Sequence, residues 1–202
     1  MEVKEIVQER LVTPGVRSLV GDLWAAYKGR LGDLLDSRTA RRAALSSGSV
    51  DLLVETANVR NASWQVDPVP DHLLERRVEL IGGANRSELI NGMNAGAKSY
   101  IADLWNFTPQ DTWSILRAHK SLSGAAKRDL AYLDDREGRV RINPATITRL
   151  MMVPRPFFVY EAALQVEGTP APGAFFDLAM AATGHGTDLI ARQGGLHLYL
   201  RD

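Results

Sequence analysis

After Val78, short apolar runs alternate with segments of helical periodicity, and this alternation restricts the fold more than any other feature of the sequence. The strand-like runs span residues 78–81, 98–102, 146–153 and 196–200, and the helical segments run from Asn85 or Ser87 to about Asn94, from Thr108 to Ser123 and from Phe175 to Ala191. Strands that alternate with helices are typical of βα units with parallel pairing. The run over 146–153 is nearly continuous in apolar residues, which favours a strand buried on both faces. Between the second and third runs, a polar turn predicts a hairpin over 130–142.

The N-terminal part has a different pattern. Apolar residues recur at three- and four-residue spacing from Gly15 to Leu35, which predicts an amphipathic helix. Capping residues at 36–39 predict the start of a second helix that Ser46 to Ser49 would end. Pro68 and Pro70 disfavour helix and mark a boundary. We therefore expect a helical region over 1–73 and an α/β region over 74–202.

Composition narrows the class of protein. The 24 Lys and Arg residues balance 24 Asp and Glu residues, so the chain has no excess of positive charge for nucleic acid or an anionic membrane, and neither is an expected partner. There is no cysteine, which excludes disulfides and thiolate chemistry and is compatible with a reducing compartment. Residues 1–8 do not have the pattern of a signal peptide or a spanning helix. We expect a cytoplasmic protein.

The last strand-like run raises a structural question. Four parallel strands with crossover helices make an open sheet, and a strand at its edge presents unpaired backbone groups that need to be covered or paired. We therefore expect another protein chain, either a second polypeptide or another copy of this one, to complete the sheet.

Six segments resemble motifs of the malate synthase family, in the same order along the chain. They read ETANVRNASW at 55–64, RRVELIG at 76–82, NGMNAGAK at 91–98, ADL at 102–104, PGAFFD at 172–177 and GGLHLYL at 194–200. The resemblance implies a (β/α)₈ barrel that follows a helical clasp and precedes a C-terminal helical domain. It also implies condensation of acetyl-CoA with glyoxylate with the help of Mg²⁺.

A complete barrel takes about 250 residues, so 202 residues cannot hold one together with a clasp. By this resemblance, residues 1–73 are the clasp and 74–202 the first half of the barrel, a partial TIM barrel. The family's Mg²⁺-binding carboxylates lie on later strands and its catalytic aspartate lies in the C-terminal domain. Neither has a counterpart here, so we expect no metal site and no cofactor.

The motif positions that are present also depart from the family. The acidic pair that follows the second strand falls on Trp105 and Asn106, and the arginine that polarises the substrate carbonyl falls on Val153. The second arginine of that motif is retained as Arg155, and its histidine becomes Phe158. Because these changes remove the charges that stabilise an enolate or alkoxide, malate synthesis by this chain alone is not expected.

Two residues are candidates for catalysis. Arg155 follows a predicted buried strand, where barrel enzymes place their chemistry, and could bind a carboxylate or polarise a carbonyl. The alternative is an ion pair with a nearby carboxylate such as Glu161. Asp103 could orient Arg155 or act as a base, and a capping or loop role is the alternative.

A second set of side chains could line the substrate site: Trp105, Asn106, Phe107, Phe157 and Phe158. Aromatic residues of this kind more often belong to a core or an interface. His185 lies between glycines, and a metal or general-base role for it is the less favoured interpretation. His72, His119 and His197 have no partner at a recognisable ligand spacing, and we expect His197 to be packed or interfacial.

Two functions remain open. In the first, a split or oligomeric barrel acts on a substrate derived from an acyl-CoA, another acyl compound or a 2-oxo acid, without the Mg²⁺ chemistry of the family. In the second, the chain is a catalytically silent scaffold or regulatory subunit that binds a partner chain. Whether it is an enzyme is left open by the sequence.

Overall fold

The computed structural model describes residues 9–48 and 54–200, and its longest element is helix α2, Pro14–Leu45. Thr13 caps the helix by accepting a hydrogen bond from the Val16 N–H (3.3 Å), and Pro14 suits the first turn. The second helix predicted after residue 36 is wrong, because α2 continues without a break to Leu45. No glycine or proline lies between Asp33 and Leu45, so the polar residues at 36–39 stay helical.

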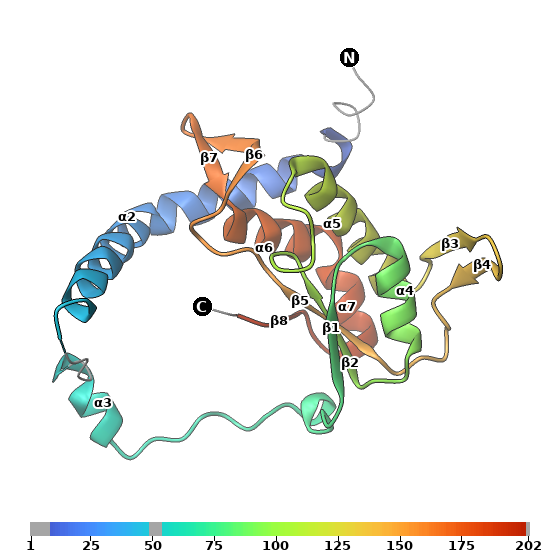
Figure 1. Cartoon of the computed structure of the whole chain (residues 1–202), viewed down its shortest axis with the longest axis horizontal. Coiled ribbons are helices and arrows are strands. Elements are labelled where there is room, and N and C mark those ends of the chain that lie inside the picture. The colour runs from blue at the N-terminus through green and yellow to red at the C-terminus, as the bar shows by residue number, and fades with distance from the viewer. Residues whose placement is uncertain (1–8, 49–53, 201–202) are drawn as a thin grey trace.

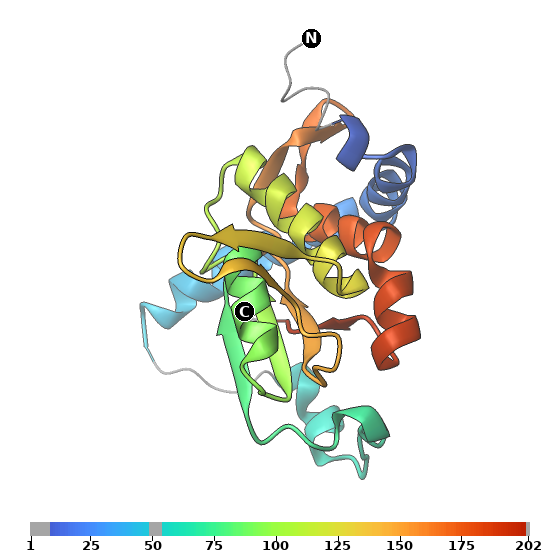
Figure 2. The same ribbon diagram turned by 90° about the vertical axis from the view of Figure 1, so that its right-hand side faces the viewer.

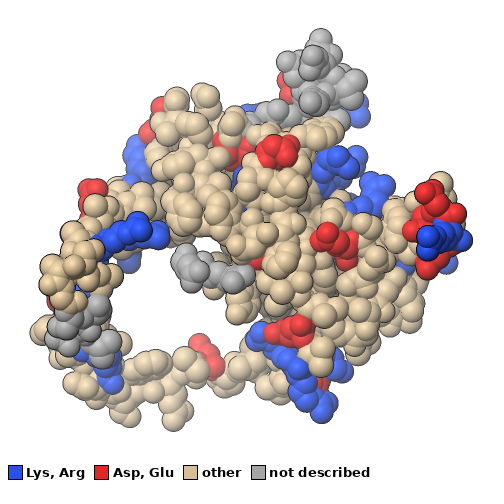
Figure 3. All heavy atoms as spheres, viewed as in Figure 1, with Lys and Arg blue, Asp and Glu red and all other residues tan. Residues whose placement is uncertain are grey.

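Beyond α2, the chain curves away from the main body and returns to it (Figure 1). This segment contains the short helices η1, Val54–Thr56, α3, Ala57–Asn61, and η2, Asp71–Leu73, joined by extended chain with exposed side chains. Figure 3 shows that the segment borders an opening that is still present when all heavy atoms are drawn. Together with α2, these short helices make the N-terminal region largely helical, as expected.

Four parallel strands form the central sheet in the order β1-β2-β5-β8. They are β1, Glu79–Gly82, β2, Ser99–Asp103, β5, Arg149–Val153, and β8, His197–Leu198. The predicted parallel sheet is confirmed, although the last two strands are shorter than the apolar runs that predicted them. Strands β1 and β8 form the edges of the sheet.

The crossover helices are α4, Arg86–Asn94, α5, Thr112–Lys127, α6, Gly173–Gly184, and α7, Gly186–Gln193. Helix α5 begins later than predicted because Asp111, and not Thr108, is its cap and accepts from the Ser114 N–H (3.0 Å). The single helix predicted over 175–191 is wrong. His185, with a φ of −146°, separates α6 from α7.

Two antiparallel hairpins complete the fold. The predicted hairpin consists of β3, Ala131–Asp134, and β4, Gly138–Arg141, and lies beside α4 (Figure 2). The other, β6, Tyr160–Val166, with β7, Thr169–Pro172, was not predicted. Its turn carries Glu167, which accepts hydrogen bonds from Trp24 and Lys28 of α2.

Two clusters of buried side chains form most of the core. One joins α4 and α5 to the sheet side chains of Tyr100, Leu150 and Met152. The other joins the first half of α2, through Val16 and Val20, to α5 and α6. The result is a mixed α/β fold with a helical N-terminal region and a parallel sheet. Closure of this sheet into a barrel, and the boundary at residue 73, remain predictions.

None of the helices in the described ranges has both the length and the apolar character needed to cross a membrane.

Candidate site at the carboxyl ends of the strands

The carboxyl ends of β2 and β5 lie side by side, because Asp103 is in register with Val153 and the Leu104 N–H bonds the Val153 carbonyl (3.1 Å). Asp103 is the last residue of β2, and the other predicted site residues lie in the loops that follow these two strands. In parallel sheets and barrels, this end is where ligands bind.

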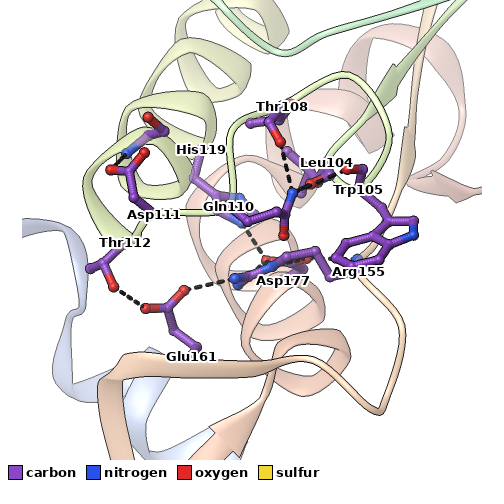
Figure 4. Close-up of polar contacts among 11 residues, drawn as sticks. Leu104, Trp105, Thr108, Gln110, Asp111, Thr112, His119, Arg155, Glu161 and Asp177 are labelled. Carbon is purple, nitrogen blue, oxygen red and sulfur yellow. Dashed lines mark hydrogen bonds and ion pairs between the residues drawn. The ribbon is translucent and has the colours of Figure 1, made fainter.

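Arg155 is 2% exposed and is bound on two sides by carboxylates (Figure 4). Its Nη1 donates to Glu161 Oε2 (2.8 Å) and its Nη2 to Asp177 Oδ1 (2.8 Å). The Arg155 backbone N–H also donates to Asp177 Oδ2 (2.8 Å). The ion pair with Glu161 that was weighed as the alternative is therefore present. These carboxylates occupy both ends of the guanidinium group. The catalytic role of Arg155 remains a prediction.

The network extends beyond Arg155 in both directions. His119 of α5 donates from Nε2 to Asp177 Oδ1 (3.0 Å), and Thr112 donates to Glu161 Oε1 (2.8 Å). Burial alone raises the pKa of Asp177, but the hydrogen bond from His119 and the charge of Arg155 outweigh it and hold the pKa below its usual range. The network thus ties the loop after β5 to α5, α6 and β6.

Our sequence analysis did not assign Asp177 or His119 to the site. Asp177 ends the PGAFFD segment that resembles the family, which was the one signal that could have pointed to it. His119 has no such signal, because its partner lies 58 positions away in the sequence.

Asp103 is fully buried and organises the turn that follows β2. Its Oδ1 accepts the backbone N–H groups of Trp105 and Asn106 (both 2.8 Å), and its Oδ2 accepts the Asn106 side-chain amide (2.9 Å). This is the loop role that was weighed as the alternative to catalysis. A role for Asp103 as a base remains a prediction.

The aromatic candidates are only partly brought together. Trp105 and Phe158 make an edge-to-face contact with ring centroids 6.0 Å apart, and the guanidinium carbon of Arg38 lies 5.5 Å from the Phe158 ring centroid. Phe157 packs instead against Phe175 of α6, with ring centroids 5.4 Å apart. Phe107 is 52% exposed and Asn106 is also exposed, and neither lines the groove described next.

A groove of about 630 Å³ opens beside the carboxyl ends of β5 and β8, with one wall formed by α2. Arg155 and Phe157 are the predicted site residues that line it, and Arg30 is the other charged residue in its wall. The remaining lining is apolar or aromatic: Leu23, Tyr27, Leu31 and Leu34 of α2; Pro154 and Pro156; Ala174, Phe175 and Leu178 of α6; Leu198 and Leu200. The groove therefore suits a ligand with a substantial apolar part.

The described residues do not fit a magnesium site. Within the ranges 9–48 and 54–200, no group of three or more His, Cys, Asp or Glu residues could hold a metal ion. Asp103 uses its carboxylate oxygens on the turn after β2, and the side chains of Trp105 and Asn106, two and three positions further on, are an indole and an amide. The expectation that the chain binds no cofactor remains a prediction.

The fold and the groove define an α/β protein with a candidate ligand site at the carboxyl ends of its parallel strands. Comparison with known proteins shows that the chain is malate synthase-like in sequence, which confirms the resemblance. It is 31% identical to malate synthase of Streptomyces clavuligerus over 198 residues, which cover 96% of this chain and 37% of that protein. It is 24% identical to malate synthase A of Escherichia coli (strain K12), over 96% of this chain and 36% of that protein.

A third relative, malate synthase of Arabidopsis thaliana, is 28% identical over 85% of this chain and 31% of its own length. No family model matches the chain. The chain thus spans about one third of the length of these curated relatives.

Proposed function

We propose that this chain is a malate synthase-like barrel component that binds an acyl substrate, such as an acyl-CoA or a 2-oxo-acid derivative, without the Mg²⁺-dependent condensation. The apolar groove at the carboxyl ends of β5 and β8 is the observation that carries this proposal. Its volume of about 630 Å³ lies within the range of ~300–1,000 Å³ found for small-molecule sites. Each methylene group buried there would contribute about 0.8 kcal/mol, so a chain of five carbons would contribute roughly 4 kcal/mol.

The charges around the groove support the loss of the condensation chemistry. Val153, which replaces the family's first arginine by resemblance, is a buried apolar strand residue. Arg155, the arginine that is retained, donates to Asp177 and Glu161. Val153 carries no charge and the charge of Arg155 is balanced by two carboxylates, which supports a shape-directed reaction in an apolar pocket as the alternative.

The edges of the sheet support a partner chain. Strand β8 pairs with β5 through two residues, and Tyr199 and Leu200 beyond it are 43% and 79% exposed. At the other edge, Ile81 of β1 is 44% exposed. A second polypeptide or another copy of this chain would pair with these edges and bury this apolar surface.

The second candidate function is a catalytically silent scaffold or regulatory subunit. The ion pairs that occupy Arg155 favour it, because they hold the residue in a structural role. An acyl substrate that binds in the groove and is turned over would argue against this candidate.

Calorimetric titration with acetyl-, butyryl- and hexanoyl-CoA tests the groove. We expect affinity to rise with chain length, and Phe157→Ala to weaken hexanoyl-CoA binding by about tenfold, equivalent to about 1.4 kcal/mol. Phe107→Ala is the matched control, because Phe107 is similarly exposed but lies outside the groove. Equal effects of the two substitutions, or affinity independent of chain length, would contradict the proposal.

Two further measurements test the other parts of the proposal. An assay with Mg²⁺, glyoxylate and acetyl-CoA should yield no malate, and malate formation would overturn the argument from Val153. Native mass spectrometry should detect self-association or a complex with a co-purified chain. A strictly monomeric protein that still turns over an acyl substrate would rule out the need for a partner.

A further inference from the structure

A second cavity, of about 360 Å³, lies apart from the groove, between the start of α2, the outer face of α5 and the junction of α6 with α7. The acyl-binding proposal makes no use of it. The groove is lined by residues of the middle of α2, from Leu23 to Leu34, whereas the cavity is lined by Val16 in the first turn of α2 and by residues that precede the helix.

Two buried imidazoles line this cavity. His119 and His185 are 2% and 3% exposed, and their ring centroids lie 6.3 Å apart. The Nε2 atom of His119 is bound to Asp177, but its Nδ1 has no hydrogen-bond partner among the described residues. The ring of His185 makes no hydrogen bond to another described residue, but the fully buried nitrogen without a partner at this cavity is that of His119. Buried polar atoms without partners are uncommon and are often explained by a bound molecule.

The rim of the cavity carries an excess of positive charge. Arg10, Lys120 and Lys127 line it, together with the single carboxylate of Asp129. Lys120 and Lys127 lie two turns apart on one face of α5, and all three cations are exposed. None of them forms an ion pair with another residue in the described part of the chain. The rim therefore has two more positive than negative side chains, and their charge is not neutralised locally.

We propose that this cavity binds the phosphate group of a small phosphorylated metabolite. A phosphate monoester carries close to two negative charges at neutral pH, which matches the excess positive charge of the rim. Lys and Arg side chains bind phosphate oxygens through charge-assisted hydrogen bonds. The imidazoles of His119 and His185 would then exchange hydrogen bonds with polar groups of the ligand. The volume is at the small end of the range for ligand sites, which restricts the ligand to a compact molecule.

Nuclear magnetic resonance of the histidine rings tests this site directly. Long-range proton–nitrogen spectra of the full ¹⁵N-labelled chain would be recorded during titration with glycerol 3-phosphate and, separately, with inorganic phosphate, at constant ionic strength. We expect saturable shifts of the His119 and His185 ring nitrogens. Shifts that stay small and linear up to about 50 mM of both probes would show that no saturable binding occurs in that range, and they would overturn the proposal.

Charge variants separate a built site from general attraction. The double variant Lys120→Gln/Lys127→Gln should weaken binding of glycerol 3-phosphate by at least about tenfold. The matched control is Arg136→Gln/Arg139→Gln, which removes two exposed positive charges from the β3–β4 hairpin, outside the cavity. A control that loses as much affinity as the lysine variant would overturn the proposal, as would acetate that binds as tightly as phosphate. Because all four side chains are exposed, the variants are expected to fold, and thermal melts would verify this.

Discussion

Asp177 accepts hydrogen bonds from both His119 and Arg155 in the candidate site, so Asp177→Asn is a sharp test of how that site is held together. The carboxylate is fully buried and receives donors from His119, from the Arg155 side chain and from the Arg155 backbone. Asparagine has almost the same volume. It removes the negative charge, however, and turns one acceptor oxygen into an amide donor that faces the donors of Arg155 or His119.

The expected loss follows from this geometry. Removing one partner of a buried ion pair leaves the other charge uncompensated and costs about 3–5 kcal/mol. Glu161 still pairs with Arg155, which favours the lower end of that range. For a chain of this size, each kcal/mol changes the melting temperature by about 2–4 °C, so we expect a decrease of roughly 6–20 °C.

Urea unfolding followed by circular dichroism at pH 7 would measure the change in the free energy of unfolding. Glu167→Gln is the matched control, because it breaks the exposed pair with Lys28 and should cost less than about 1 kcal/mol. Because the folded pKa of Asp177 is below its unfolded value, its contribution is present above the unfolded pKa and is lost as the pH falls through the folded pKa. The variant should therefore lose less stability than the parent under strongly acidic conditions. A loss at pH 7 no larger than that of Glu167→Gln would refute the reasoning.

Two further predictions concern a glycine and a histidine. Gly92→Ala places a methyl group in steric overlap with the ring of Tyr100 and should destabilise the chain by about 1–3 kcal/mol. Gly29→Ala has open space around it in the exposed part of α2 and should stabilise the chain by up to about 1 kcal/mol. Urea unfolding measures both changes, and a Gly92→Ala variant as stable as the parent would contradict the packing of α4 on β2. Burial, and secondarily the nearby His119, lowers the pKa of His185 to about 3. The contribution of the neutral His185 ring to stability is therefore present above about pH 6.5 and is lost as the pH falls towards 3. His185→Gln should flatten this pH dependence of the free energy of unfolding, and parallel pH profiles of the variant and the parent would contradict the prediction.

The parallel sheet could be predicted from the sequence because the signal is local. Each of the four strands lies in or overlaps a short apolar run, and helical periodicity separates most of the runs. The predicted break in α2 is wrong because the cap-forming residues at 36–39 stay helical where no glycine or proline lies between Asp33 and Leu45. The β6–β7 hairpin is harder to predict from the sequence, because Pro170 and Pro172 disfavour a strand, although an edge strand tolerates proline.

The candidate site was harder to predict than the fold, because its contacts join distant positions. Arg155 and its partner Glu161 are six residues apart, and this pair was weighed as an alternative. Asp177 is 22 residues from Arg155 and His119 is 58 residues from Asp177, so no local pattern links them. The groove was not predicted either, because the α2 residues that form one of its walls have the periodicity of any amphipathic helix.

The contacts of Arg155 link a buried charge network to the wall of the groove. The side chain points from the loop after β5 towards Asp177 of α6 and Glu161 of β6, and the backbone N–H of the same residue also binds Asp177. These contacts fix the start of the loop that carries Pro156 and Phe157 into the wall of the groove. Arg155 therefore lines the groove and also anchors the loop that forms part of its wall, so the shape of that wall depends on ion pairs with Asp177 and Glu161, which lie outside the groove lining.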